Sequence, residues 1–372
     1  MRRLLGTLAI LLCLVVSAQP IAADEQAFQE QKQIFLVSLQ SKVLTQFFKA
    51  PMSIHAQILL PDSYYKDPTR KYPTLYWLPA FEAPFELDAG MRNQFQRAMR
   101  ESHVELIVVS MEGSFGGMDP EYADSASFGP WGAALVDEFI PITEARFRAI
   151  SSGDSRFVAG HSSGGWSSLW LQVNYPMMFG GAWSISPDPV DFHDFTGPDL
   201  TARPPGNFYR DAAGRDYGIN QAPWTMAALA EDPNWGWRQL KSFEWVFSPP
   251  GTDGQPQPLF DRKTGVIDPD VAEYWEDHYD ISRILRDRWP ELGPKLRGKL
   301  HVMVCAHDTF HLDRPVRLLQ QELTTLGSDA EIDIPPCGDH WEIYSWHGGL
   351  IHYIVGEIGD RLAATNAAQA SP

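Results

Sequence analysis

Short apolar runs alternate with longer amphipathic stretches along most of the chain. The apolar runs predict strands at 33–38, 53–60, 72–78, 105–110, 157–160, 180–186, 299–305 and 330–334. Apolar residues at helical spacing predict helices at 88–102, 131–146, 167–173, 313–326 and 340–364. Strands that alternate with helices indicate an α/β fold, with a mostly parallel sheet flanked by helices on both faces. We expect the first two strands to form an antiparallel edge of this sheet.

The alternation stops between residues 187 and 298, where proline and tryptophan are frequent. Only two parts of this stretch, around 224–231 and 269–289, have the spacing of helices. We interpret the stretch as an aromatic-rich cap insertion between two strands. Its rings could line a wall over a ligand, or they could form the core of a packed subdomain. The tryptophans concerned are Trp224, Trp235, Trp237, Trp245 and Trp275.

The N-terminus has the pattern of an export signal. Two arginines precede an apolar run from Leu4 to about Ala18, and Ala22-Ala23 provide a small-residue cleavage site. The run is short for a membrane span, and no other apolar stretch is long enough. We therefore expect residues 1–23 to be a cleaved signal peptide and 24–372 to form the domain of a secreted or periplasmic protein. A retained N-terminal anchor is the alternative.

The charge balance narrows the possible partners. The 372 residues include 30 Lys and Arg against 47 Asp and Glu, which gives a formal net charge of −17. Because such an acidic surface repels phosphates, we expect neither nucleic acid nor, once the signal is removed, a membrane as a partner. The sequence has no paired metal-ligand spacing and no glycine fingerprint for a dinucleotide, so we expect no metal and no cofactor.

One motif points to chemistry. Gly160-His161-Ser162-Ser163-Gly164 has the G-x-S-x-G spacing of a nucleophile elbow, in which a serine stands on a sharp turn between a strand and a helix. The predicted strand 157–160 and the predicted helix 167–173 flank it in that order. Such a motif also occurs by chance, so its value depends on whether an acid and a histidine follow. With them, Ser162 is the expected nucleophile.

Two residues at strand ends complete this pattern. A serine hydroxyl needs a base, and the base needs a carboxylate that orients it. Asp308 follows the predicted strand 299–305 and His340 follows the last strand, which gives the order Ser162, Asp308, His340. Asp188, after the strand 180–186, is the alternative acid. Other histidines, interpreted as pocket, packing or surface residues, are His307, His347 and His352.

Two cysteines give an independent indication. Cys305 and Cys337 each stand three residues before a predicted catalytic residue, Asp308 and His340. If the two strands are neighbours, the sulfurs lie close together beneath the catalytic loops. We expect a disulfide that ties the acid loop to the base loop, which suits an oxidising compartment. Two buried thiols are the alternative.

An oxyanion hole requires two backbone N–H groups aimed at the developing negative charge. The residue after the nucleophile, Ser163, should supply one of them. The loop after Leu78 should supply the other, and Phe81 is the expected donor.

Taken together, these features resemble the "Putative esterase" branch of the α/β hydrolases, which includes esterase D, feruloyl esterases, siderophore-ester hydrolases and mycolyltransferases. The resemblance covers roughly 33–186 and 299–360, and it implies the α/β-hydrolase fold. This sequence departs from the branch at Pro79-Ala80, where members commonly have His-Gly or Asp-Gly, and at Trp341, which directly follows the histidine. The matching segments are Leu60-Pro61, Tyr72 to Leu78, Tyr122 to Ser125, Glu138 to Pro141, Gly160 to Gly165 and Gly338 to His340.

The resemblance implies a serine esterase that hydrolyses a carboxylic ester through an acyl-enzyme, with a small-molecule or glycan-linked ester as substrate. The same triad also serves acyltransferases, in which an alcohol or a sugar replaces water. A non-catalytic binding protein on a hydrolase scaffold is the third hypothesis. Aromatic rings in the cap would fit a phenolic, sugar or acyl ligand equally well.

Overall fold

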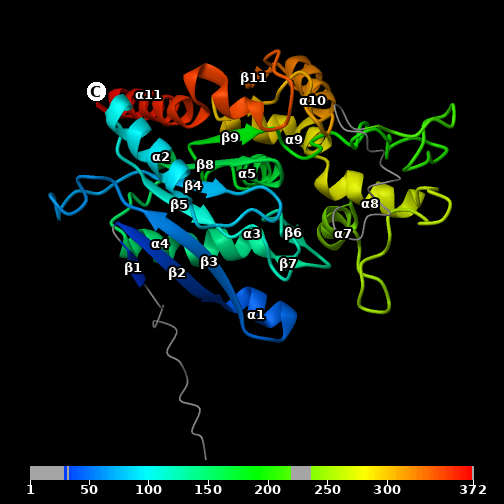
Figure 1. The fold of residues 1–372 in the computed structure, drawn as a ribbon, viewed down its shortest axis with the longest axis horizontal. Helices are drawn as coiled ribbons and strands as arrows, with labels where there is room; N and C mark the ends of the chain where they lie inside the picture. Colours follow the sequence, from blue (N-terminus) through cyan, green and yellow to red (C-terminus); the bar gives the residue numbers. More distant parts are fainter. Residues whose placement is uncertain (1–28, 32, 219–235, 371–372) are drawn as a thin grey trace, which may run out of the picture.

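A nine-stranded sheet runs through the centre of the computed structural model, which describes residues 29–31, 33–218 and 236–370 (Figure 1). The strands cross the sheet in the order β1-β2-β3-β5-β4-β8-β9-β10-β11. Their bounds are β1 (Gln29–Gln31), β2 (Ile34–Ser41), β3 (Met52–Leu59), β4 (Thr74–Leu78), β5 (Ile107–Met111), β8 (Arg156–His161), β9 (Gly181–Ile185), β10 (Leu300–Met303) and β11 (Glu331–Asp333). A separate two-stranded ribbon pairs β6 (Asp124–Ser125) with β7 (Gly129–Pro130).

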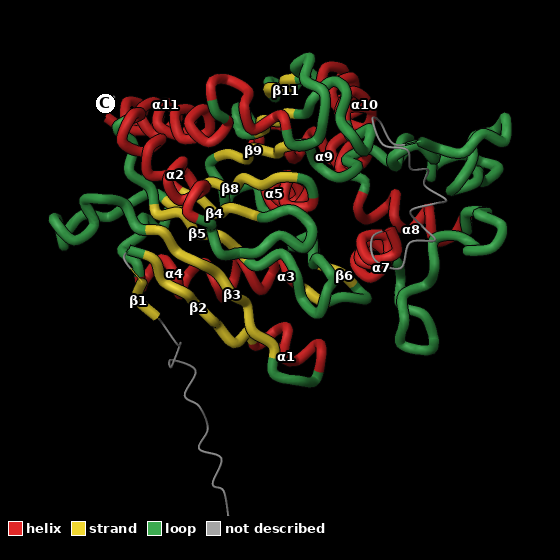
Figure 2. Tube along the Cα trace, in the orientation of Figure 1, coloured by secondary structure: helices red, strands yellow, loops and turns green. Residues whose placement is uncertain are grey.

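The sheet is antiparallel at its first edge and parallel elsewhere. β1, β2, β3 and β5 pair antiparallel in succession. From β5 across to β11 every neighbouring pair is parallel, so these strands all end at one edge of the sheet. Figure 2 shows the strands with helices on both sides of them. The α/β fold class and the antiparallel edge predicted from the sequence are therefore confirmed.

Helices cover both faces. α2 and α11 pack against each other on one face, while α5 and α9 lie together on the other. The α-helices are α1 (Lys42–Phe48), α2 (Ala89–Ser102), α3 (Trp131–Ala133), α4 (Ile140–Arg146), α5 (Ser163–Asn174), α7 (Gly236–Phe247), α8 (Pro269–Tyr279), α9 (Ile281–Leu296), α10 (Asp313–Thr325) and α11 (Leu350–Ala370). The π-helical stretch is η1 (Ala134–Phe139), and the 3₁₀ helices are η2 (Gly153–Ser155) and η3 (Glu342–Gly348).

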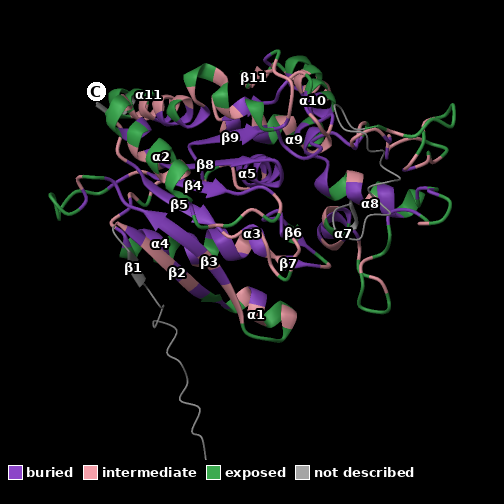
Figure 3. Ribbon diagram, in the orientation of Figure 1, coloured by how far each residue is buried: buried purple, intermediate pink, exposed green. Residues whose placement is uncertain are grey.

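Each face of the sheet has its own hydrophobic core, because successive side chains of a strand point to opposite faces. In β4, Leu75 and Trp77 pack in the core under α2 and α11, where Trp77 meets Phe95 edge to face at 5.7 Å. The intervening Tyr76 and the following Leu78 pack in the core under α5 and α9. Both faces of β4 are therefore buried, which explains the continuous apolar run in the sequence (Figure 3).

Three predicted helices are less regular than the hydrophobic spacing indicated. The helix expected at 131–146 contains the π-helical η1. The helix expected at 269–289 divides into α8 and α9 at Asp280, whose side chain accepts the backbone N–H of Arg283 at 3.0 Å and begins α9. The closing helix expected at 340–364 is interrupted at His347, Gly348 and Gly349, all of which have positive φ. The helices expected at 269–289 and 340–364 are therefore interrupted, because caps and left-handed residues leave the apolar spacing intact, whereas the helix expected at 131–146 is continuous and differs only in its π-helical stretch.

The stretch 187–298 contains α7 and α8, which lie beyond the arrowheads of the central strands in Figure 1, and α9, which packs with α5 on a face of the sheet. Trp275 is fully buried against Phe195 and Phe247, at ring distances of 5.6 and 5.3 Å. Trp245 lies 6.0 Å from the ring of Phe128. These two tryptophans form packing rather than an exposed wall. Outside the described residues lie 1–23, the predicted helix 224–231, Trp224, Trp235 and the side chain of Trp237.

Within the described residues, none of the helices combines the length and the apolar character that a membrane span requires.

Candidate active site

Ser162 occupies the turn between β8, which ends at His161, and α5, which begins at Ser163. Its φ of 58° and ψ of −120° place it in a strained conformation, as expected of a nucleophile on a sharp turn. The flanking glycines are required because β4 runs beside the turn. A Cβ on Gly160 would lie 2.6 Å from the carbonyl oxygen of Leu78, and a Cβ on Gly164 would overlap the same oxygen.

The predicted base and acid form a buried pair. Nδ1 of His340 lies 2.7 Å from Oδ2 of Asp308, and the two side chains are 1% and 0% exposed. The other carboxylate oxygen of Asp308 accepts the backbone N–H of Phe310 at 2.8 Å. A carboxylate can only accept, so Nδ1 of His340 carries the proton and Nε2 is left as the basic nitrogen.

Ser162 and His340 line one cavity of about 150 Å³. Half of its other lining residues are aromatic, and these other residues are Ala80, Phe81, Glu82, Gln239, Phe310 and Trp341. Within the described part of the chain, Ser162 and His340 share no hydrogen bond, and the serine hydroxyl instead donates to Oδ1 of Asp188 at 3.5 Å. Catalytic hydrogen bonds often tighten only when substrate binds, so the separation is compatible with a nucleophile and its base.

Of the two residues expected to supply oxyanion donors, Ser163 directly follows the serine and Phe81 lines the same cavity. The N–H of Ser163 is at the first position of α5, where helical N–H groups have no partner within the helix. Phe81 lies in a turn that is closed by the N–H of Ala83 and the carbonyl oxygen of Ala80 at 2.9 Å. Glu82 of this turn forms an ion pair with Arg238 of α7. The cap helix therefore contacts the loop that should hold the second donor.

The predicted disulfide is confirmed. Cys305 and Cys337 are bonded, with their Cα atoms 4.9 Å apart. β10 and β11 are parallel neighbours, which brings the loops that follow them together. The N–H of His307 also donates to the carbonyl oxygen of Cys337 at 3.3 Å. The alternative of two unpaired thiols is therefore wrong.

Asp188, the alternative acid, contacts the elbow rather than the histidine. Oδ2 of Asp188 accepts the hydroxyl of Ser163 at 2.6 Å and the side-chain amide of Gln239 at 3.3 Å. Burial raises the pKa of Asp188 above its ordinary value. The acid that reaches the histidine is Asp308, as predicted.

Two further buried carboxyl groups lie near Asp188, and no sequence motif predicts them. Burial raises the pKa of both Asp119 and Glu121 well above the ordinary range. Glu121 accepts the hydroxyl of Ser167 in α5 at 3.2 Å. Both acids stand in an irregular loop, where no periodicity marks a residue as buried.

His161, the residue before the nucleophile, is a functional neighbour that the motif alone could have indicated. Nε2 of His161 lies 3.0 Å from the backbone carbonyl oxygen of His340, and its ring is 4.7 Å from that of Trp341. Burial lowers the pKa of His161 well below its ordinary value, so the ring is neutral and Nε2–H donates. This bond fixes the loop that holds the base.

The remaining histidines considered from the sequence do not line the cavity. His307 is exposed. His347 pairs with Asp333 at 3.0 Å, and His352 pairs with Glu101 at 3.4 Å.

Comparison with known proteins places this site in a family. The sequence profile of the family described as "Putative esterase" matches residues 49–250, more than half of the chain. The chain belongs to this esterase family. No curated protein matches the sequence. The resemblance seen in the motifs is thereby confirmed, and so is the α/β-hydrolase fold.

Solved structures of similar fold are also esterases and serine hydrolases. A ferulic acid esterase is 17% identical with a TM-score of 0.57, and the match covers 90% of this chain and 100% of that one. FphF, a fluorophosphonate-binding serine hydrolase of Staphylococcus aureus solved with substrate bound, is 15% identical with a TM-score of 0.53 and coverage of 90% and 98%. An S-formylglutathione hydrolase, FrmB of Staphylococcus aureus, is 15% identical with a TM-score of 0.51 and coverage of 90% and 99%. At these identities the likeness shows the fold.

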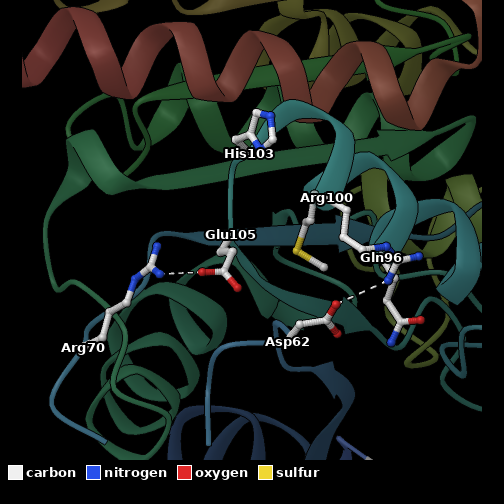
Figure 4. Close-up of a pocket in the computed structure, with 7 residues that line it drawn as sticks. Asp62, Arg70, Gln96, Arg100, His103 and Glu105 are labelled. Carbon is white, nitrogen blue, oxygen red and sulfur yellow. Dashed lines mark hydrogen bonds and ion pairs between the residues drawn. The ribbon is translucent and has the colours of Figure 1, made fainter. Parts of the chain in front are cut away.

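The esterase has a second cavity, of about 310 Å³, at the opposite edge of the sheet (Figure 4). Its lining residues Arg100, His103 and Glu105 precede β5, whereas the proposed site follows the carboxyl ends of the strands. Ion pairs join Arg70 to Glu105 at 2.5 Å and Arg100 to Asp62 at 3.3 Å. The charged groups of this cavity are therefore paired with one another.

Among the described residues, two groups of side chains have the spacing of metal ligands, and neither includes Ser162, Asp308 or His340. In the first group, the ring of His193 already pairs with Asp191 at 2.7 Å. In the second, the ring of His301 lies 3.4 Å from Glu331. The two groups are Asp191, His193 and Asp280, and His301, Glu331 and Glu357.

Proposed function

We propose that this family member is a serine esterase that hydrolyses carboxylic esters through an acyl-enzyme. Ser162 is the nucleophile, His340 is the general base and acid, and Asp308 orients His340. The N–H groups of Ser163 and Phe81 stabilise the oxyanion. One observation carries the proposal: a serine held at positive φ at the start of α5 shares a cavity with a buried histidine bonded to a carboxylate.

The reaction follows from the groups in this cavity. Oγ of Ser162 attacks the ester carbonyl carbon while Nε2 of His340 takes the hydroxyl proton. The tetrahedral intermediate collapses, and His340 gives that proton to the departing alkoxide, which leaves as an alcohol. A water molecule then attacks the acyl-serine while Nε2 of His340 takes its proton, and His340 returns this proton to Oγ of Ser162 as the carboxylic acid is released. Asp308 stabilises the imidazolium that forms in each half of the cycle.

Covalent labelling tests the nucleophile directly. A fluorophosphonate probe should label the wild-type protein, and mass spectrometry should place the adduct on Ser162. S162A should lose both the label and the hydrolysis of p-nitrophenyl acetate. S345A, which changes an exposed serine of η3, is the control and should keep both. A folded wild-type protein that is neither labelled nor active would contradict the proposal.

The size of the cavity favours a compact acyl group. Pockets for drug-sized ligands have volumes of about 300 to 1,000 Å³, and this cavity measures about 150 Å³. We therefore expect p-nitrophenyl acetate to be cleaved with a higher kcat/KM than the octanoate. A panel that adds feruloyl and acetyl-sugar esters would define the acid and the alcohol. A rising kcat/KM with acyl chain length would contradict a compact acyl site.

We also propose that the protein is exported, with residues 1–23 removed as a signal peptide. The disulfide between Cys305 and Cys337 supports this proposal, because such bonds persist in oxidising compartments. The N-terminal sequence of the protein purified from its native host should begin near Asp24. Recovery of the full-length chain in the cytoplasm would contradict export.

A further inference from the structure

Asp188 is attached to the nucleophile elbow at three points. Its backbone N–H donates to the carbonyl oxygen of Ser162 at 3.2 Å. Its Oδ2 accepts the hydroxyl of Ser163 at 2.6 Å, and its Oδ1 lies 3.5 Å from Oγ of Ser162. A serine at positive φ persists only when its surroundings hold it there, so these contacts stabilise the strained conformation of the elbow.

The surroundings of Asp188 contain other acids but no paired Lys or Arg. Asp119 and Glu121 come from the loop before β6, and all three carboxyl groups are at most 4% exposed. Among the described residues, no Lys or Arg forms an ion pair with any of the three, and Oδ2 of Asp119 and Oε1 of Glu121 have no hydrogen-bond partner. A buried carboxyl group without a cation keeps its proton, so Asp119 and Glu121 are held neutral.

Asp188 differs from these two acids because a potential cation, His340, acts on it in addition to hydrogen-bond donors. Burial raises its pKa, whereas the hydroxyl of Ser163, the charge of His340 and the amide of Gln239 lower it. The charge of Asp308 acts in the opposite direction and raises it. Of the three clustered acids, Asp188 is therefore the one that ionises most readily, and its Oδ1 lies 3.5 Å from Oγ of Ser162, the hydroxyl that His340 is proposed to deprotonate.

We propose that Asp188 is a positioning residue that holds the nucleophile elbow and presents a second negative charge, besides that of Asp308, to His340. The inference rests on the proposed esterase function. His340 becomes an imidazolium when it takes the proton of Ser162, and two carboxylates stabilise that cation. Asp188 neither forms nor breaks a bond and does not take the proton itself.

Helix α7 of the cap sets the environment of Asp188. Gln239 donates to its carboxylate, and Ser242, three residues along the same helix, accepts the N–H of Asp119 at 2.7 Å and donates to its carbonyl oxygen at 2.9 Å. The cap is thus attached both to Asp188 and to the loop that carries the neutral acids. Replacing Gln239 should therefore change the ionisation of Asp188, and the altered charge of Asp188 should change the protonation of His340.

The pH profile of D188N tests the inference, because Asn retains the shape and the hydrogen-bonding oxygen but not the charge. The acidic limb of kcat/KM reports the protonation of His340 in the free enzyme. A nearby anion favours the protonated imidazole, so removing the anion should move the limb to lower pH, by roughly half a pH unit. Because the imidazolium of the transition state also loses support, kcat/KM on the plateau should fall about tenfold.

Two further variants make the test specific. Q239L removes one donor that favours the ionised form of Asp188, so its limb should move in the same direction as that of D188N but less far. Q257L, at an exposed glutamine of the cap that bonds to the carbonyl oxygen of Pro250, should leave the limb in place. In a D308N background, D188N should lower kcat/KM by a larger factor than it does in the wild type, because Asp188 is then the remaining anion at His340.

An unmoved acidic limb in both D188N and Q239L would overturn the inference and leave Asp188 a purely structural residue. An equal fall in kcat/KM on adding D188N to the wild type and to D308N would also overturn it. Failure of the proposed function is a separate result, because it is read from fluorophosphonate labelling of Ser162 in the wild-type protein. If D188N does not fold, Q239L and the D308N/Q239L double variant carry the same test.

Discussion

Nδ1 of His340 lies 2.7 Å from Oδ2 of Asp308, and each residue stands three positions after one half of the disulfide between Cys337 and Cys305. The bond between the sulfurs fixes the separation of the two loops, and the bond between the side chains fixes the imidazole ring. A covalent and an electrostatic contact thus hold the same pair of loops. The geometry of the proposed base depends on both.

Replacing Asp308 should impair catalysis without unfolding the protein. D308N cannot hold His340 in the tautomer that leaves Nε2 basic, and it removes the charge that stabilises the imidazolium. We expect kcat to fall by roughly 10²- to 10⁴-fold. D339N, next to His340 but at a half-buried carboxylate that accepts the backbone N–H groups of Trp341 and Glu342, is the matched control. Equal activity of D308N and wild type would contradict the role of Asp308.

Breaking the disulfide should lower both stability and activity. The bond closes a loop with a sequence separation of 32, and a disulfide that closes a loop of this length stabilises the fold by roughly 3.5 to 4 kcal/mol. C305S/C337S should therefore unfold at lower urea concentration than wild type. Its kcat should also fall, because the loops bearing Asp308 and His340 lose their covalent link.

The control is the wild-type protein measured with and without a reductant in urea. Thiol titration of the unfolded, unreduced protein should find no free thiol at Cys305 or Cys337. Two free thiols, or a double variant as stable as wild type, would contradict this account.

The catalytic candidates were predictable because the parallel sheet gathers strand ends at one edge. Ser162, Asp308 and His340 each follow a predicted strand, so their placement at strand ends, more than their order in the chain, indicated their proximity. The disulfide followed from the same reasoning, since Cys305 and Cys337 sit at equal distances before two of them. Periodicity thus identified the residues that the regular part of the fold positions.

The environment of the serine was not predictable, because irregular segments supply it. Gln239 comes from α7 in the insertion, and Glu121 comes from a loop without periodic spacing. The burial of Asp188 depends on both segments, so the sequence could identify it only as an alternative acid. Rings of the insertion were considered as a wall over the ligand, but the aromatic residues that line the cavity, Phe81, Phe310 and Trp341, lie outside the insertion.

Substitution by alanine should change the stability of the protein in opposite directions at two helical glycines. A Cβ on Gly165 in α5 would lie 2.5 Å from the carbonyl oxygen of Ile185, so G165A must push α5 away from β9. We expect a loss of about 1 to 3 kcal/mol of stability, together with reduced labelling of Ser162 at the start of this helix. Gly356 in α11 has its nearest neighbour at 4.0 Å, so G356A should be neutral or gain up to about 1 kcal/mol. Urea unfolding of both variants provides the comparison, and equal destabilisation would contradict the close approach of α5 to β9.

The stability of the protein should respond to the titration of Glu112, which follows β5. Burial and the nearby charge of Glu86 raise the pKa of Glu112 from 4.5 to about 7 in the folded state. The folded protein therefore binds more protons than the unfolded chain between these values, and this group's contribution to stability falls as pH rises from 4.5 to 7. Above pH 7 the carboxylate is charged in both states and the loss is complete.

E112Q removes this titration, so its stability relative to wild type should rise between pH 5 and 7 and stay constant above. Glu112 is only half buried, so solvent screening limits the gain to about 1 kcal/mol. Urea unfolding at pH 5, 6, 7 and 8 measures the difference. E101Q is the control, and its stability relative to wild type should change with pH in the opposite direction. Arg97 lowers the pKa of Glu101, so the folded state favours the charged form of this residue. A constant difference between E112Q and wild type from pH 5 to 8 would show that Glu112 ionises equally in the folded and unfolded states.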